Sequence, residues 1–314
     1  MAYRTLTDRD VDDCLSMREA VQIIERAFVE RAEGTFVSPP RFRVDGGGGA
    51  LVFTAGGAIG SEKLVGFRVY DTFPGEHPDR TQLVAVFSAE TGVLQGIVIG
   101  ERVGIMRTGA IGGVAVKHMA RPDAATLAIL GTGKQARAQL EAAVAVHDFQ
   151  TVKVYSPNAE HRRRFIEAME PKVAADLCAV ESARACVDGA DVVICATNSS
   201  SPVLEADWVK EGAHINTVGP KYVGAHEIPI ELIQRSGALV TDSLEQLQAY
   251  PKPHVATQAS RTPDMIDLAD IVAGKAAGRK GVRDITLFFS VGLAGTEVVV
   301  AGEVLRRAGV SAQG

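Results

Sequence analysis

A short apolar run, Ala125 to Leu130, ends in the turn Gly131-Thr132-Gly133, and a helical pattern follows over residues 137–146. Gly131 permits a tight turn, and Gly133 lacks a Cβ where a pyrophosphate must approach the backbone. Ala136 is small enough for the helix to pack on the strand. The N–H groups at the start of the helix then point toward the phosphates. Because the glycines lie between a strand and a helix, the sequence predicts a dinucleotide site.

The end of the second predicted strand, residues 151–156, bears on the choice of cofactor. An NAD site usually has Asp or Glu here, but the sequence reads Ser156-Pro157-Asn158, with Glu160 nearby. Ser156, Asn158 and Arg162 could hold a 2′-phosphate by charge-assisted hydrogen bonds. The alternative is that the arginines at 162–164 form a solvated helix face. We expect NADP or dual use, with NAD as the alternative.

The other cofactor contacts are expected at the carboxyl ends of successive strands. The predicted cofactor-binding positions are Gly131, Thr132, Gly133, Lys134, Gln135, Ala136, Ser156, Asn158, Arg162, Thr197, Val218 and Gly219.

The composition excludes several classes of protein. The chain has 314 residues, enough for two domains, and a net charge of −5, which argues against a nucleic-acid partner. No apolar run reaches the ~20 residues that span a bilayer, and residues 1–17 lack the apolar core of a signal peptide, so we expect a cytoplasmic protein without membrane contact. The cysteines are scattered, which favours free thiols over disulfides or a metal site.

Two kinds of pattern divide the chain. Residues 1–100 predict an amphipathic helix at 17–33, an extended segment at 38–43 and β-runs at 50–55, 63–70, 83–88 and 93–99, with a glycine turn at 46–49. Residues 101–119 predict a close-packed helix. From 125 onward strands and helices alternate. The predicted strands are 151–156, 179–180, 191–196, 213–218, 238–242 and 286–290, and the predicted helices are 158–169 and 296–307.

These patterns predict an α/β fold, a Rossmann doubly wound parallel sheet with an α+β domain beside it. The Rossmann domain is expected over 121–295. Residues 1–120 form the other domain, to which residues 296–314 return.

Several blocks together resemble the ornithine cyclodeaminase/mu-crystallin family over nearly the whole length. These blocks are Lys63, Arg107-Thr108, Gly131-Thr132-Gly133 and Ser290-Val291-Gly292-Leu293-Ala294. The resemblance implies that the N-terminal domain binds substrate and forms a homodimer through its sheet. It also implies that Arg107, Thr108, Ser290 and Gly292 contact the cofactor.

The resemblance implies a substrate-binding set as well. Arg41 matches the arginine that binds the substrate α-carboxylate, with Arg43 as the alternative. Lys63 matches the lysine that contacts the same carboxylate and the reacting centre, and Arg107 matches an arginine between substrate and phosphate. A guanidinium binds a carboxylate through two parallel hydrogen bonds, while a lysine supplies a movable point charge. Thr81 and Gln82 are candidate pocket residues.

One position departs from the family pattern. Cyclodeaminases of the family have an aspartate after a Val-Gly or Gly-Gly pair, but Pro220 follows Val218-Gly219 here. Glu227 matches a family glutamate further along and does not replace the aspartate. Cyclodeamination needs proton transfers at several steps, whereas a protonated imine is already electrophilic toward hydride. The substitution therefore favours imine reduction.

The proton donor stays open. His77 is the candidate catalytic acid, and Asp71, Asp79 and His226 are alternatives.

The expected function is an NAD(P)H-dependent reductase of α-imino acids that gives an L-amino acid, reversible as an amino-acid dehydrogenase. The imine could be of the ketimine, pyrroline-carboxylate or iminosuccinate type. The alternatives are an ornithine-type cyclodeaminase that releases ammonia, and a non-catalytic binder of small ligands that depends on NADPH.

Overall fold

The computed structural model describes residues 5–75, 77 and 81–309, and the chain separates into two compact units. Unit 1 comprises Met1–Arg107 and Gly292–Gly314, and unit 2 comprises Thr108–Val291. Both differ in their limits from the predicted 1–120 and 121–295. At the first junction, the Arg107 side chain pairs with Glu297 of unit 1, and the Thr108 carbonyl accepts a hydrogen bond from Gln139 of unit 2.

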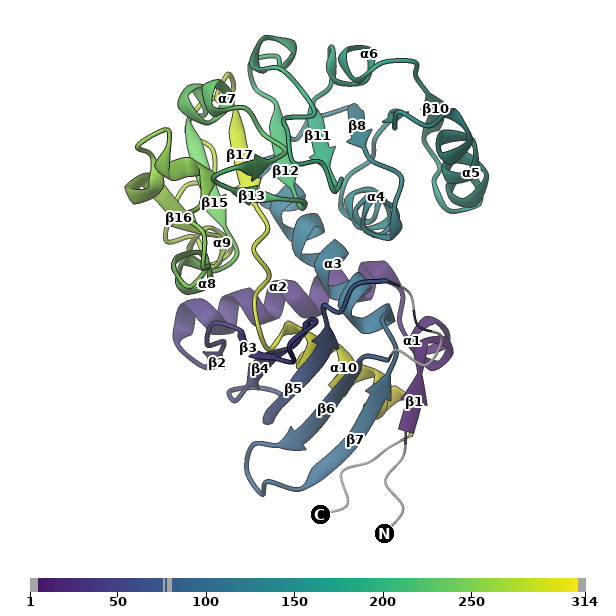
Figure 1. Ribbon diagram of the computed structural model, residues 1–314, viewed down its shortest axis with the longest axis vertical. Helices are drawn as coiled ribbons and strands as arrows, with labels where there is room; N and C mark the ends of the chain where they lie inside the picture. Colours follow the sequence, from purple (N-terminus) through teal and green to yellow (C-terminus); the bar gives the residue numbers. More distant parts are fainter. Residues whose placement is uncertain (1–4, 76, 78–80, 310–314) are drawn as a thin grey trace. The chain divides into compact units, whose positions relative to one another are not determined.

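Unit 2 is built on an eight-stranded parallel sheet in the order β10-β9-β8-β11-β12-β17-β15-β16 (Figure 1). Its strands are β8 (Thr126–Leu130), β9 (Thr151–Tyr155), β10 (Asp176–Ala179), β11 (Val192–Cys195), β12 (His214–Thr217), β15 (Ala238–Thr241), β16 (Met265–Asp267) and β17 (Thr286–Phe289). Its longer helices are α4 (Lys134–Val146) and α5 (Ala159–Met169). The fold class predicted for this part is confirmed.

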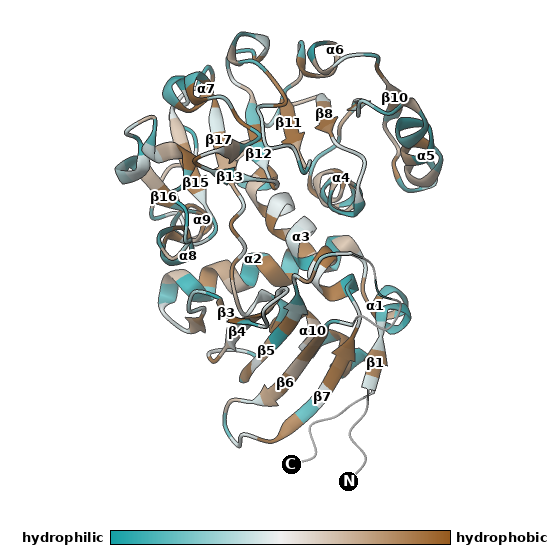
Figure 2. Ribbon diagram, viewed as in Figure 1, coloured by the Kyte–Doolittle hydropathy of each residue, from teal (hydrophilic) through white to brown (hydrophobic). Residues whose placement is uncertain are grey.

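The central strands are apolar on both faces, as a parallel sheet covered by helices requires. Figure 2 shows β8, β11 and β17 as hydrophobic ribbons, while α5 carries hydrophilic residues. Two buried clusters cover the sheet, one containing Phe165 from α5 and the other Leu232 from α7 (Ile230–Arg235). The strand order reverses between β8 and β11, and ligands of doubly wound sheets bind at such a point.

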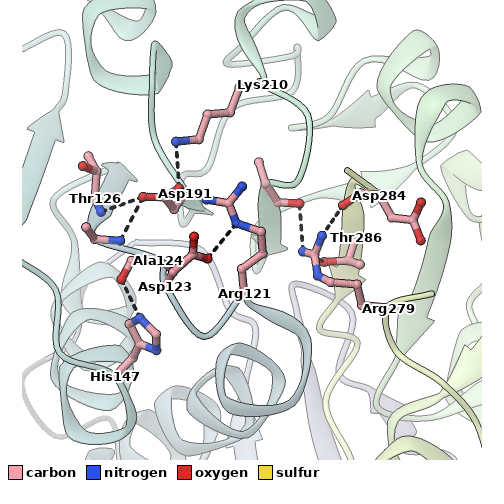
Figure 3. Close-up of polar contacts among 12 residues, drawn as sticks. Arg121, Asp123, Ala124, Thr126, His147, Asp191, Lys210, Arg279, Asp284 and Thr286 are labelled. Atoms are coloured by element: carbon pink, nitrogen blue, oxygen red, sulfur yellow. Dashed lines mark hydrogen bonds and ion pairs between the residues drawn. The ribbon is translucent and has the colours of Figure 1, made fainter. Parts of the chain in front are cut away.

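A charged network holds the amino ends of β8 and β11 (Figure 3). Asp191 accepts hydrogen bonds from the backbone N–H groups of Ala125 and Thr126 at 2.9 and 3.0 Å, and from Arg121 at 2.8 Å. Lys210 Nζ lies 2.7 Å from the same carboxylate. Burial alone would raise the pKa of Asp191, but the hydrogen bonds from Lys210 and the backbone hold it below its usual value. This network satisfies strand ends opposite the glycine turn, so its role is structural.

Unit 1 contains a second sheet, in the order β1-β7-β6-β5-β4-β2 with β3 paired to β4. Its strands are β1 (Thr5–Thr7), β2 (Phe36–Val37), β3 (Phe42–Asp45), β4 (Ala50–Ala58), β5 (Leu64–Asp71), β6 (Leu83–Ser88) and β7 (Leu94–Ile99). All pairs except β1 with β7 are antiparallel, so the predicted mostly antiparallel sheet is confirmed.

Helices α2 (Met17–Glu33) and α10 (Thr296–Arg307) pack within unit 1, and α10 lies across β4, β5, β6 and β7 (Figure 1). The close fit depends on glycines: a Cβ on Gly66 of β5 would meet the Val298 side chain at 3.3 Å, and one on Gly302 would meet Leu64. Helix α1 (Asp8–Cys14) and helix α3 (Arg102–Met119) flank this sheet in sequence.

Several short elements were not predicted. They are β1, β2, β3, β13 (Lys221–Tyr222), β14 (Ala225–His226), β16, α1, α6 (Ala183–Val187), α7, α8 (Leu244–Gln248) and α9 (Leu268–Val272), with 3-10 turns at Glu170–Lys172, Ala206–Trp208, Val255–Thr257 and Thr262–Asp264. The predicted strand at 179–180 is wrong in its limits, because β10 runs over Asp176–Ala179 in register with β9. Such elements span too few residues to show a period.

Candidate functional site

A cavity of about 920 Å³ lies in unit 2 at the carboxyl ends of β8, β9, β11 and β12. Many of the predicted cofactor positions line it together: Gly131, Thr132, Gly133, Lys134, Gln135, Ser156, Thr197, Val218 and Gly219. Prediction from sequence did not find its other lining residues, Leu130, Arg137, Tyr155, Pro157, His161, Arg164, Ala196, Asn198 and Val203. The cavity opens where the strand order reverses, as expected for a dinucleotide.

The glycine turn has the backbone that a dinucleotide requires. Gly131 has φ +110°, and a Cβ there would meet the Ala196 carbonyl oxygen at 2.3 Å. A Cβ on Gly133 would have no neighbour within 4 Å, so this side of the turn is open to a ligand. Gly133 is also the N-cap of α4 and provides no side-chain cap, which leaves N–H groups of the first turn for phosphate oxygens. These features fit NAD or NADP.

Glu227 holds two of the lining loops in place. Its side chain is fully buried. One carboxylate oxygen accepts hydrogen bonds from the N–H and hydroxyl of Thr197, at 2.6 and 2.7 Å. The other accepts from the Gly219 N–H at 2.6 Å and the Thr217 hydroxyl at 3.0 Å. The carboxylate therefore joins the loop after β11 to the loop after β12.

Five predicted cofactor residues do not line the cavity and are held within the fold instead. Asn158 is the N-cap of α5 and accepts a hydrogen bond from the His161 N–H at 3.1 Å. Arg162 is buried and donates to the Ser156 carbonyl and to Glu181, both at 2.7 Å. Ala136 is fully buried beneath the turn. Thr108 bonds Gln139 through its carbonyl, and Ser290 donates its N–H to the Thr217 carbonyl at 3.0 Å.

A second group of polar side chains gathers in unit 1. Glu297, fully buried on α10, lies with one carboxylate oxygen 3.0 Å from Arg107 Nη2 and 3.4 Å from Arg68 Nη1. The Thr54 hydroxyl donates to the same oxygen at 3.2 Å. Arg41 donates to the Tyr70 hydroxyl at 3.3 Å, and its charge also acts on Glu297. We call Arg41, Arg68, Arg107 and Glu297 the arginine cluster.

The electrostatics of the arginine cluster favour an anion. Burial alone would raise the pKa of Glu297, but Arg107 and Arg68 outweigh it and the pKa stays below its usual value. Burial lowers the pKa of Arg68, and the neighbouring charge of Arg107 adds to that effect. Repulsion between two guanidiniums is relieved by negative charge, which Glu297 supplies in part and a carboxylate ligand would supply further.

Gly292 brings Arg41 and Arg107 together. It has φ +88°, and a Cβ there would meet Arg41 Nη2 at 3.0 Å and Arg107 Nη1 at 3.2 Å. The predicted Gln82 also joins this region, because its side-chain oxygen accepts a hydrogen bond from Arg68. Arg43, the alternative to Arg41, is exposed and pairs with Asp45 at 2.6 Å.

Lys63 lies at a different place. It precedes β5 with φ +54°, its side chain is 52% exposed, and its Nζ lies 3.1 Å from Glu90. Arg68 lies five residues further, about 16 Å along an extended chain. The basic side chain of β5 that pairs with Glu297, as Arg107 does, is therefore Arg68. Prediction from sequence missed this residue.

The candidate proton donors are dispersed. His77 is exposed, and Asp79 lies outside the described residues. Asp71 accepts a hydrogen bond from the Phe73 N–H at 3.1 Å, and His226 contacts the Ile228 carbonyl at 2.7 Å. After Pro220, Lys221 donates to the carbonyls of Val218 and Gly219, so this segment supports the cavity wall. Within the described part of the chain, no group of His, Cys, Asp and Glu side chains is arranged to hold a metal ion.

The parallel sheet with its glycine turn and cavity defines a protein with a Rossmann dinucleotide-binding unit. Comparison with known proteins places it more closely: the model of the ornithine cyclodeaminase/mu-crystallin family matches residues 3–311. The chain belongs to this family.

Three relatives illustrate the range. Alanine dehydrogenase of Archaeoglobus fulgidus is 31% identical over 96% of this chain and 94% of its own. The structure of Thermococcus litoralis Δ1-pyrroline-2-carboxylate reductase with NADH and L-proline is 31% identical, with a TM-score of 0.86 over 97% of each chain. An archaeal alanine dehydrogenase dimer with bound NAD is 29% identical, with a TM-score of 0.88 over 98% of this chain and 96% of that one.

Proposed function

We propose that this protein is an NAD(P)H-dependent reductase of α-imino acids that forms L-amino acids and runs in reverse as an amino-acid dehydrogenase. The arginine cluster is the observation that carries the proposal. It presents three guanidiniums around one buried carboxylate, a setting that suits the carboxylate of an imino acid. The glycine turn and cavity of unit 2 suit the dinucleotide.

When bound, NAD(P)H supplies the hydride. The residues of this chain have two tasks in the proposal. Arg41 and Arg107, set side by side at Gly292, bind the substrate carboxylate, and Arg68 is the third cation. Glu297 holds Arg68 and Arg107 in position. Fixing the carboxylate orients the C=N bond, which lowers the entropic part of the barrier.

Pro220 argues against cyclodeamination. The family aspartate that follows the Val-Gly pair has no equivalent at this position, and the next side chain, Lys221, donates to the backbone of Val218 and Gly219. A reductase needs fewer proton transfers than a cyclodeaminase and tolerates this loss.

The test is NADPH and NADH oxidation with a panel of imines. The panel contains Δ1-pyrroline-2-carboxylate, Δ1-piperideine-2-carboxylate, and pyruvate, glyoxylate and oxaloacetate, each of the last three with ammonium. Turnover on one member that Arg107→Ala abolishes supports the proposal. Silence on every imine, with ammonia released from ornithine, would instead establish the cyclodeaminase. Tight NADPH binding without any turnover would indicate a ligand-binding protein.

We further infer a homodimer that forms through the sheet of unit 1. Val52, Val84 and Val86 are buried on one face, where α10 packs. The other face carries Phe42, Phe53, Phe67 and Phe87, whose ring centroids follow one another at 5.0, 6.3 and 6.4 Å. An apolar face of this kind suits a second copy of the chain, and the archaeal alanine dehydrogenase above is a dimer.

We also infer a cytoplasmic location, since all four cysteines are free thiols. No described helix is long and apolar enough to cross a membrane.

A further inference from the structure

The cavity of unit 2 is basic beside the end of β9. Arg137, His161 and Arg164 are among the residues that line it, and Ser156 stands at the position where an NAD site usually has an acid. None of the described residues that line the cavity is Asp or Glu. The carboxylate that would accept a hydrogen bond from the 2′-hydroxyl of NAD is therefore missing from this wall.

The arginine that the sequence favours for a 2′-phosphate has another role. Arg162 is buried, donates to the Ser156 carbonyl and to Glu181, and lies over the Tyr155 ring. It fixes the shape of the loop after β9. The next arginines diverge: Arg164 lines the cavity, while Arg163 is not part of its wall and bonds Glu160 and Glu167.

Glu160 is the acid closest in sequence to Ser156, and its carboxylate is bound by two arginines. The hydrogen bond from Arg163 is the main reason that its pKa falls to about 2, so it stays ionised. Both of its oxygens accept from Arg163, and one also accepts from Arg164 Nε at 2.8 Å. In the described structure Arg164 uses only Nε in this pair, which leaves its two Nη groups for an anion in the cavity.

We propose that Ser156, His161 and Arg164 form a subsite for the 2′-phosphate, and that the protein prefers NADP(H) to NAD(H). The inference rests on the proposed function, because it concerns the same cofactor cavity. The Nη groups of Arg164 can bind two phosphate oxygens, and the Ser156 hydroxyl and the His161 ring can donate to the phosphate. NADP differs from NAD by this phosphate alone, so the subsite discriminates between these two cofactors.

The test measures binding without turnover. Calorimetric titration of the full chain with NADP⁺, NAD⁺, 2′,5′-ADP and 5′-AMP gives four dissociation constants. We expect NADP⁺ to bind at least about tenfold more tightly than NAD⁺, and 2′,5′-ADP to exceed 5′-AMP by a similar factor. Arg164→Ala should remove about tenfold of this preference and leave the NAD⁺ affinity within about threefold. Arg163→Ala is the matched control, since it also breaks a pair with Glu160, and it should preserve the preference.

Each other result has a separate meaning. Equal or tighter binding of NAD⁺ overturns the inference and leaves the proposed reductase intact. A preference for NADP⁺ that survives both Arg164→Ala and His161→Ala overturns the assignment of the subsite. If neither dinucleotide binds, the proposed function itself fails.

Discussion

Glu297 Oε1 lies 3.0 Å from Arg107 Nη2, and the same oxygen lies 3.4 Å from Arg68 Nη1. One carboxylate on α10 thus joins an arginine of α3 to an arginine of β5, and the Glu297 side chain is only 1% exposed. Burying such an ion pair costs free energy because both charges lose their water. Removing one partner costs more, because the other charge stays buried without a partner. The arrangement therefore indicates a site that needs positively charged side chains in fixed positions. Glu297 is the residue that fixes Arg68 and Arg107 there.

Replacing this carboxylate tests its role as a positioning residue. Glu297→Gln keeps the shape of the side chain but leaves Arg68 and Arg107 without their shared negative charge. The free energy of unfolding should therefore fall by about 3 kcal/mol. The Michaelis constant for the imino acid should rise at least about tenfold, because the arginines are no longer held. Urea denaturation and steady-state kinetics measure the two effects.

Glu303→Gln is the control on the same helix. Glu303 is 14% exposed, but its partners Arg306 and Arg307 are 67% and 30% exposed, so its replacement should cost less stability than that of Glu297. If both variants lose the same stability and keep the same Michaelis constant, Glu297 has no special role.

Arg68 and Lys63 give opposite predictions. Because Arg68 lies in the arginine cluster and Lys63 pairs with Glu90 at the surface, Arg68→Ala should lower kcat/KM at least about 100-fold, while Lys63→Ala changes it less than about threefold. Arg68→Lys should restore activity only in part, since a lysine cannot make two parallel hydrogen bonds. The reverse order of effects would support the role that the family resemblance gave to Lys63.

The cofactor turn was predictable because its signal is local. Gly131 and Gly133 lie between an apolar run and a helical pattern, so the turn, strand and helix could be inferred from about 20 consecutive residues. The alternation of strands and helices that follows could also be predicted from the sequence. Arg162 shows the limit of this reasoning, because its side chain folds back onto Ser156 and no sequence pattern indicates that direction.

The arginine cluster was only partly predictable. Arg68 is one basic residue in a strand of unit 1. Lys63 lies only five residues before it, and the motif comparison assigned the substrate-binding role to Lys63. The pairing of β4 with β5 sets Arg68 opposite Thr54, which itself bonds Glu297. A charged residue directly before the apolar run at 298–301 was the available signal for Glu297, because a charge beside such a run needs a partner if it is buried.

Glu227 should control cofactor affinity through the loops that it joins. All four groups that approach its carboxylate donate hydrogen bonds, so Glu227→Gln places an amide donor against two other donors. We expect the dissociation constants of NADP⁺ and NAD⁺ to rise together, about 10- to 100-fold. Calorimetry checks this, with the exposed Glu231→Gln on α7 as the control. Unchanged affinity would show that the loops keep their position without the carboxylate.

Two buried histidines should make the protein less stable in mild acid. Burial lowers the pKa of His214 and of His254 from 6.5 to about 3. Below pH 6.5 the unfolded chain binds protons at these positions and the folded chain does not, so stability falls as the pH drops from 6.5 toward 3. Between pH 7.5 and 5.5 each histidine should cost about 1 kcal/mol.

Urea midpoints at the two pH values measure this loss. His254→Gln removes one of the two titrating groups, so it should reduce the difference between the midpoints by up to half. A variant with the same pH dependence as the unaltered protein would show that His254 is protonated in the folded state.

The row of aromatic rings on the sheet of unit 1, Phe42, Phe53, Phe67 and Phe87, allows a test of the oligomeric state. Phe42 is 56% exposed and stacks on Phe53 with the ring planes 5° apart, so a charge at this position would be forced into the proposed interface. Phe42→Asp should shift the protein from dimer to monomer, because an unpaired buried charge opposes association by several kcal/mol. Light scattering after size exclusion reports the mass. Val282→Asp is the control, since Val282 is 76% exposed and lies in unit 2, outside this sheet. A monomer already in the unaltered protein, or a dimer that survives Phe42→Asp and Phe67→Asp together, would rule out this face as the interface.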